Sequence, residues 1–250
     1  MKNDKLILWF LIPILIFAIA GAFAMSMTTS LVDEHMYISA SVFVAQDQEL
    51  YKDFAFLQVP YLPLLYGNLY RILGIESYYL FIGKLISFLF LGIASAVLFL
   101  LARRVLHDLF LSLGIVTLFL LNITILNSAA LATNFMIPVA LSMISFYLFY
   151  ISFIENQIKL VGITVAGIFL ALAIGTKLTI ATAAIPFVAI IFCYLAMGKY
   201  PSINAKRNIV YSLFFYISGL TIGLLPILFF MSDLESFSFN NLGFHNANTR

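Results

Sequence analysis

The sequence predicts an all-α membrane protein, a polytopic bundle of about seven transmembrane helices. Of its 250 residues, 63% are hydrophobic and 10% are charged, whereas soluble domains are about 45–50% apolar and about 25% charged. Several apolar runs reach the length of about 20 residues that a helix needs to cross a bilayer. The ten-residue alternation typical of membrane barrels does not occur along the chain.

The apolar runs define the expected helices in order along the chain. They cover residues 6–27, 78–101, 109–126, 135–154, 160–175, 178–197 and 208–230. The first run follows a positive start and has the composition of a signal peptide, but its length of about 20 residues favours an uncleaved helix. The fifth run is short, and only the polar stretch 175–179, GTKLT, separates it from the sixth.

Basic residues between the runs predict the orientation of the helices. With the N-terminus inside, the inner segments hold eight of the 13 Lys and Arg residues: Lys2, Lys5, Arg103, Arg104, Lys159, Lys199, Lys206 and Arg207. Cytoplasmic loops carry an excess of such residues. The sequence therefore predicts the N-terminus inside and the C-terminus outside. A long loop, 28–77, and a polar tail, 231–250, then lie outside.

Loop 28–77 is predicted to contain two short helices. The first covers about 34–45 with Asp33 at its N-terminal end, where Asp33 and Glu34 complement the helix dipole and Ser30 caps the preceding turn. This explanation of the acid pair needs no chemistry. The second helix is amphipathic and lies in the membrane interface. Its start is set by Pro60 and Pro63 and its apolar face by Tyr61, Leu64, Leu65, Leu69, Ile72 and Leu73.

The same loop, DEHMYISASVFVAQDQELYKDFAFLQVPYLPLLYGNLYRILG at residues 33–74, resembles a known family. It is similar to the first extracytoplasmic loop of membrane glycosyltransferases of the GT-C class, such as protein O-mannosyltransferases and lipid A aminoarabinose transferases. The resemblance is carried by Asp33-Glu34, by LYKDF at 50–54, and by Pro60, Pro63 and Tyr66. The glycine usual before the Tyr is absent, and Asn134 stands in the second outer loop, where many relatives carry an acid.

The resemblance implies transfer of a sugar from a polyprenyl-phosphate donor to a glycan, lipid or protein acceptor, with inversion. Asp33 would be the general base and Glu34 would assist it. Cations for the donor phosphate are expected among Lys177, Lys84 and Arg71, although a lysine near a helix end also snorkels to the interface. The expected substrate-binding residues are Asp53, Tyr51, Tyr61 and His245. Relatives are longer, so we expect 1–250 to be a single glycosyltransferase-like membrane domain and the N-terminal portion of such an enzyme.

No cofactor is expected, with a divalent metal as the remaining option. Asp33, Glu34 and His35 point in different directions from one helix start, and no His or Cys spacing typical of a metal site occurs. The net charge of +2 does not predict nucleic-acid binding. The expected location is a bacterial cytoplasmic membrane with the active site facing outside. A transporter or lipid flippase, or a non-catalytic membrane subunit, remains an alternative.

Overall fold

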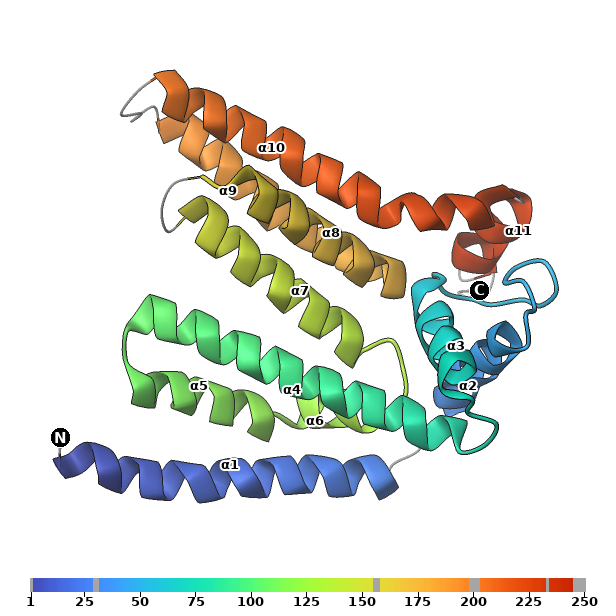
Figure 1. Ribbon diagram of the computed structural model, residues 1–250, viewed down its shortest axis with the longest axis horizontal. Helices are drawn as coiled ribbons and strands as arrows, with labels where there is room; N and C mark the ends of the chain where they lie inside the picture. The colour runs from blue at the N-terminus through green and yellow to red at the C-terminus, as the bar shows by residue number, and fades with distance from the viewer. Residues whose placement is uncertain (1, 29–31, 155–157, 198–202, 233, 245–250) are drawn as a thin grey trace. The chain divides into compact units, whose positions relative to one another are not determined.

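The computed structural model describes residues 2–28, 32–154, 158–197, 203–232 and 234–244. These ranges are helical apart from turns and an isolated bridge between Leu50 and Phe54, so the all-α prediction is confirmed. Figure 1 shows the helices in order. They are α1 (Lys2–Thr28), α2 (Val32–Ala45), α3 (Tyr61–Leu73), α4 (Tyr79–Leu106), α5 (Leu109–Leu121), α6 (Ile123–Ala130), α7 (Met136–Phe149), α8 (Leu160–Thr176), α9 (Ala184–Met197), α10 (Ile203–Leu224) and α11 (Leu234–Ser238), with the 3₁₀ segments η2 (Leu178–Ala183) and η3 (Leu225–Ser232) and the π segments η1 (Tyr150–Ile154) and η4 (Phe239–Gly243).

Four helical stretches of the described chain are long and apolar enough to cross a membrane: Tyr79–Leu106, Met136–Ile154, Leu178–Met197 and Asn208–Phe230. The number rises to six if two bent pairs, α1 with α2 and α5 with α6, each form one span. The helix α8 is apolar but shorter. A membrane protein is therefore indicated, while the count of seven spans and the orientation stay predictions.

The chain divides into two compact units. The first consists of Met1–Gln48 and Leu62–Ala140, and the second of Glu49–Tyr61 and Leu141–Arg250. Loop 28–77 thus contributes its two helices, α2 and nearly all of α3, to the first unit. Its middle segment, Glu49–Tyr61, belongs to the second unit.

In the first unit, α1, α4 and α5 run alongside one another (Figure 1), and α2 and α3 lie at the start of α4. The two helices expected in loop 28–77 are present as α2 and α3. The buried face of α3 is formed by Leu62, Pro63, Tyr66, Gly67 and Tyr70. The residues predicted to face lipid lie on the other side, where Ile72 and Leu73 are exposed. This helix therefore has a second apolar face, packed within the protein, that the sequence analysis did not identify.

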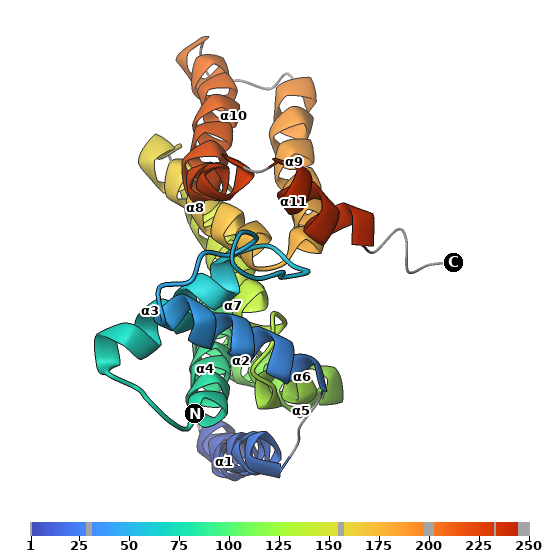
Figure 2. The ribbon, with the colours of Figure 1, turned by 90° about the vertical axis from the view of Figure 1, so that its right-hand side faces the viewer.

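In the second unit, α8 and α10 lie side by side in parallel (Figures 1 and 2). Gly167 of α8 meets Gly219 of α10, and Ala171 lies against Gly223 one turn further on. Small residues let the two backbones approach closely, which is how helices associate where lipid replaces water. Beside this contact, Phe149, Phe187 and Tyr216 form an aromatic core.

Replacing Gly167 by Ala tests whether this close approach determines the stability of the second unit. A Cβ atom at Gly167 would lie 2.4 Å from the carbonyl oxygen of Tyr216 and 3.0 Å from the nitrogen of Leu220. Because both neighbours are backbone atoms, the helices must separate, and we expect a loss of about 1–3 kcal/mol of unfolding free energy. Thermal unfolding of the detergent-solubilised chain measures it.

Gly114→Ala in α5 is the matched control. A Cβ at Gly114 meets no atom within 4 Å, and alanine favours a helix over glycine by about 0.8–1.0 kcal/mol. This variant should be unchanged or more stable. Equal losses in the two variants would contradict the role given to the α8–α10 contact.

Candidate active site

The acid pair lies on the first turn of α2, and its two members have opposite environments. Asp33 is exposed, whereas Glu34 is buried, with 0% of the residue accessible. Successive residues of a helix point about 100° apart, so one carboxylate faces outward while its neighbour enters the protein. His35, next along the helix, is again exposed.

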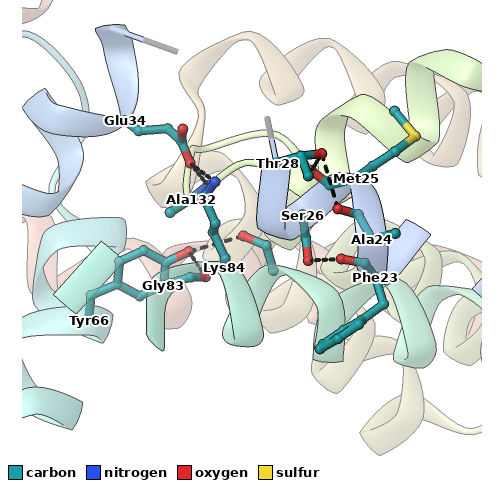
Figure 3. A network of polar contacts seen from close by, with 11 residues as sticks. Phe23, Ala24, Met25, Ser26, Thr28, Glu34, Tyr66, Gly83, Lys84 and Ala132 are labelled. Carbon is teal, nitrogen blue, oxygen red and sulfur yellow. Dashed lines mark hydrogen bonds and ion pairs between the residues drawn. The ribbon is translucent and has the colours of Figure 1, made fainter. Parts of the chain in front are cut away.

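Glu34 is held by two contacts within the first unit, which Figure 3 shows from close by. Its Oε1 accepts a hydrogen bond from the backbone N–H of Ala132 at 2.8 Å. The Nζ of Lys84, in α4, lies 3.8 Å from the same oxygen. Lys84 is itself only 6% exposed. A buried charge is tolerated where an opposite charge and a hydrogen bond accompany it, so the contact joins α2, α4 and the segment before α7.

The helices around this ion pair are packed without room for larger side chains. Next to Lys84, Gly83 has so little space that a Cβ would lie 2.8 Å from Ile38 and 2.9 Å from Ala132. The hydroxyl of Tyr66, in α3, lies 3.3 Å from both the Gly83 carbonyl oxygen and the Ser87 hydroxyl. Burial raises the pKa of Tyr66 above its usual range, so the hydroxyl stays protonated. Four segments therefore meet directly behind Asp33.

Arg71 is engaged elsewhere in the same unit. One guanidinium nitrogen forms an ion pair with Asp47, which follows α2, and the other donates to Asn68 Oδ1 at 2.9 Å. These contacts tie the end of α3 to the end of α2. A donor phosphate at Arg71 would have to compete with Asp47.

In the second unit, Tyr51 is a structural anchor of the segment Glu49–Tyr61. Its ring is buried, and its hydroxyl donates to the carbonyl oxygen of Gln58 at 2.5 Å. The ring contacts Phe230 and Phe237 edge-on, at centroid distances of 6.1 and 5.3 Å. Burial raises the pKa of Tyr51 above its usual range. The segment is thereby fixed to the C-terminal part of the described chain.

Asp53 stabilises the turn beside Tyr51. Its Oδ2 accepts the backbone N–H of Glu49 at 2.7 Å, and the Glu49 carboxylate accepts from Lys52 at 2.8 Å. Both acids are exposed. One oxygen of Asp53 thus has a local role in this turn.

Tyr61 lies beside the end of α8, and Lys177 is the residue that directly follows this helix. The Tyr61 hydroxyl donates to the carbonyl oxygen of Gly223 at 2.6 Å, and its ring lies so close to Gly175 that any side chain there would overlap it. Burial raises the pKa of Tyr61 to about 12. Lys177 follows α8 directly and is partly buried, and this burial lowers its pKa.

The structure therefore brings together some predicted site residues and separates others. Glu34 meets Lys84, and Tyr61 meets the end of α8 that precedes Lys177. Asp33, Glu34, Lys84 and Arg71 belong to the first unit; Tyr51, Asp53, Tyr61 and Lys177 belong to the second. Ser30 and His245 lie outside the described residues. Within the described ranges, no group of three His, Cys, Asp or Glu residues could hold a metal.

The sequence analysis did not identify the contacts of Glu34 with Lys84 and with the N–H of Ala132. The available signal was Lys84 itself, because a lysine several residues inside an apolar run requires either the interface or a counter-charge. The identity of its partner depends on the tertiary fold.

Comparisons with protein-family models, with curated proteins and with solved structures found no match to this chain. The chemistry of the residues above and the resemblance of loop 28–77 are therefore the two indications of a function for this chain.

Removing Lys84 tests the ion pair. Lys84→Met leaves the Glu34 carboxylate buried without its cation, and we expect a loss of about 3–5 kcal/mol of unfolding free energy. The double variant Glu34→Gln/Lys84→Met should lose less than the sum of the single losses, because the two side chains interact. Thermal unfolding in detergent measures all three variants.

Lys52→Met is the matched control, since it removes an ion pair that is exposed. The side chains of Lys52 and Glu49 are 70% and 64% accessible, and such pairs contribute at most about 1 kcal/mol. Additive losses in the double variant, or equal losses for Lys84→Met and Lys52→Met, would contradict the stabilising role of the buried pair.

Proposed function

We propose that this protein is an integral membrane glycosyltransferase that takes a sugar from a polyprenyl-phosphate donor. The proposal is carried by one observation: an exposed carboxylate, Asp33, stands next to a buried carboxylate fixed by a lysine and a backbone N–H. The resemblance of residues 33–74 to the GT-C class supports the same reaction. The acceptor is a glycan, lipid or protein hydroxyl.

Asp33 acts as the general base in this reaction. Its carboxylate accepts the proton of the acceptor hydroxyl while the acceptor oxygen forms a bond to the anomeric carbon. The bond between that carbon and the phosphate oxygen breaks, and the lipid phosphate leaves with the bonding electrons. Attack on the face opposite the leaving group inverts the anomeric centre. Exposure makes Asp33 accessible to an acceptor that arrives from solution.

Glu34 has a positioning role. Since its Oε1 already accepts from Ala132 and faces Lys84, it holds the first turn of α2 in one orientation. A base must be held within a few tenths of an ångström of its working position. Lys84 then neutralises the charge of Glu34, so a different cation is needed to bind the donor phosphate.

Lys177 is the cation that best suits the leaving phosphate. Lys177 stands at the break between the apolar helix α8 and the candidate span Leu178–Met197, a position that suits a phosphate in the headgroup layer. An ammonium group acts there as a point charge on the departing oxygen. Tyr61 packs against Gly175 at the end of α8 that precedes Lys177. Tyr51 and Asp53 hold the segment Glu49–Tyr61 that leads to Tyr61.

The proposed protein crosses a bacterial cytoplasmic membrane seven times, with the N-terminus inside. Seven spans result if α1, the four long helices, the bent pair α5 and α6, and α8 all cross. Loop 28–77 then faces outside, where a polyprenyl-phosphate sugar is presented. The exposed Ile72 and Leu73 of α3 fit a helix resting on the outer leaflet.

A transporter or lipid flippase is the second candidate. The observation that favours it is the bend of 63° between α5 and α6, followed by the buried residues Leu131–Asn134 between α6 and α7. Broken helices beside buried charges are typical of transport sites. Movement of a labelled lipid-linked sugar across sealed vesicles without release of the sugar would favour this function.

Asp33→Asn tests the proposed enzyme. The amide cannot accept the acceptor proton, so transfer should fall at least about 100-fold. Membranes that contain the protein are supplied with labelled polyprenyl-phosphate sugars, and loss of label from the donor is measured.

His35→Asn is the matched control, because His35 is exposed on the same turn and has no role in the reaction. Its transfer rate should equal that of the unmodified chain. Sealed right-side-out vesicles with an impermeant acceptor check the predicted orientation. Undiminished transfer by Asp33→Asn would overturn the assignment of the base.

Lys177 gives a prediction that depends on pH. Burial lowers the pKa of Lys177, so its positive charge is lost at a lower pH than that of an exposed lysine. We expect the KM for the donor to rise as the pH becomes alkaline. Lys177→Met should raise the KM for the donor about tenfold at neutral pH, because one charge-assisted hydrogen bond is lost.

Lys177→Arg keeps the charge at every accessible pH, so its KM should not rise in the alkaline range. Lys52→Met is the control for surface charge. The partner Glu49 raises the pKa of Lys52, chiefly through their hydrogen bond. Removal of the Lys52 charge in Lys52→Met should leave the KM for the donor unchanged. A KM that rises identically in the Lys177→Arg variant would remove Lys177 from the phosphate site.

A further inference from the structure

The turn between α3 and α4 presents an open concavity with an exposed apolar rim. The concavity has a volume of about 640 Å³, and Glu76, Ser77, Tyr78 and Phe81 contribute to its lining. Tyr78 is 80% exposed, and the preceding Ile72 is 77% exposed. Large apolar side chains exposed together on one turn indicate a contact surface.

The length of α4 places this turn at the depth of lipid headgroups. The helix has 28 residues and is a candidate span, and at 1.5 Å per residue it is about 42 Å long. The hydrocarbon core of a bilayer is about 30 Å thick, so the ends of α4 extend into the headgroup layers. Tyr78 directly precedes α4, at the level where tyrosine is enriched.

The charge of the turn favours a cationic headgroup. Residues 68–82 contain two charged side chains, Arg71 and Glu76. Because Arg71 is paired with Asp47, the carboxylate of Glu76 is the remaining charge beside the concavity. The exposed ring of Tyr78 can also bind an ammonium group through its face.

Tyr78 adopts an uncommon backbone conformation although its side chain is exposed. Its φ is 59°, in the left-handed region, which is uncommon and strained for a residue with a large side chain. Its side chain is not buried in return. Strained residues of this kind cluster at ligand sites.

A second feature continues the surface along α4. An apolar groove of about 350 Å³ lies among α1, α4 and α5, and α4 contributes Phe88, Gly92, Ser95 and Phe99 to it. The Ser95 hydroxyl donates to the Leu91 carbonyl oxygen at 2.8 Å, so the lining is suited to hydrocarbon. Phe81, Phe88, Gly92 and Phe99 are spaced seven, four and seven residues apart, which puts them on one face of α4. Phe81 and Phe88 are about 10 Å apart along the axis.

We infer that a phospholipid with a protonated amine headgroup binds along this face of α4. Its ammonium group lies at Glu76 and Tyr78, and one of its acyl chains enters the groove beside Gly92. The rise of about 10 Å from Phe81, which lines the concavity, to Phe88, which lines the groove, suits a lipid whose chain descends from the headgroup layer. An anionic lipid is disfavoured because Glu76 repels it. This lipid is a bound component of the bilayer and is distinct from any sugar donor, so the inference does not depend on the proposed function.

Retention of lipid by the purified full chain tests the inference. The chain is equilibrated in nanodiscs with equal amounts of phosphatidylethanolamine, phosphatidylcholine and phosphatidylglycerol, transferred to detergent, and analysed by native mass spectrometry. The unmodified chain should retain phosphatidylethanolamine preferentially. Glu76→Gln should reduce this preference about two- to fivefold, the effect of one exposed ion pair. Gly92→Leu should reduce retention of all three lipids by filling the groove.

Matched controls are provided by residues in similar positions away from the surface. Gly114→Leu adds the same side chain where, as at Gly92, a Cβ meets no atom within 4 Å. Glu235→Gln removes an exposed carboxylate of α11. Both controls should retain lipid as the unmodified chain does.

Tyr78→Asn separates binding from folding. Asparagine accepts the left-handed conformation more readily, so this variant should be at least as stable thermally while it retains less phosphatidylethanolamine. His107→Asn relieves the same conformation, with φ of 55°, at the other end of α4 and should leave retention unchanged. Three results would each overturn the inference. The first is that the test variants behave as their controls, and the second is a preference for phosphatidylglycerol. The third is that Gly92→Leu loses lipid although the unmodified chain shows no headgroup preference.

Discussion

The first unit depends on the requirement that a charge buried among apolar helices has a partner. Glu34 and Lys84 come from different helices, and the third participant, Ala132, is 98 residues from Glu34 in the chain. Either charge alone would carry a large desolvation cost, and the ion pair with its hydrogen bond offsets that cost where α2, α4 and the segment before α7 meet. Gly83 permits this approach, since a side chain there would overlap Ile38 and Ala132.

Local patterns predicted much of this arrangement but not its tertiary contacts. The start of α2 at an acid pair and the helical spacing of Tyr61 to Leu73 are properties of neighbouring residues, and both helices are present. For Lys84 the sequence predicts either a site at the donor phosphate or snorkelling to the interface, and the structure adds a contact with Glu34 that neither pattern contains. A sequence read residue by residue contains no information on which distant acid meets a buried lysine.

The hydropathy pattern also failed to reveal two features, a break between two helices and a tertiary contact near the C-terminal end. The run 109–126 was predicted as one helix, yet α5 ends before Asn122, whose side chain accepts the N–H groups of Thr124 and Ile125 and begins α6. One amide scarcely alters the mean hydropathy of such a run, although asparagine is a preferred helix cap. Similarly, residues 231–250 were interpreted as a polar tail, but Phe237 packs on Tyr51. Aromatic side chains in a polar segment were the signal for that contact.

The same helix end serves both polar and apolar requirements. Lys84 and Phe81 are three residues apart on α4, yet Lys84 is buried against Glu34 while Phe81 is 43% exposed. The proposed general base needs a fixed backbone, and the proposed action on lipid-linked substrates needs that backbone at the membrane surface. The ion pair anchors α2 to the first turns of α4, a candidate span. In the proposed enzyme this contact would fix the position of the Asp33 carboxylate along the membrane normal.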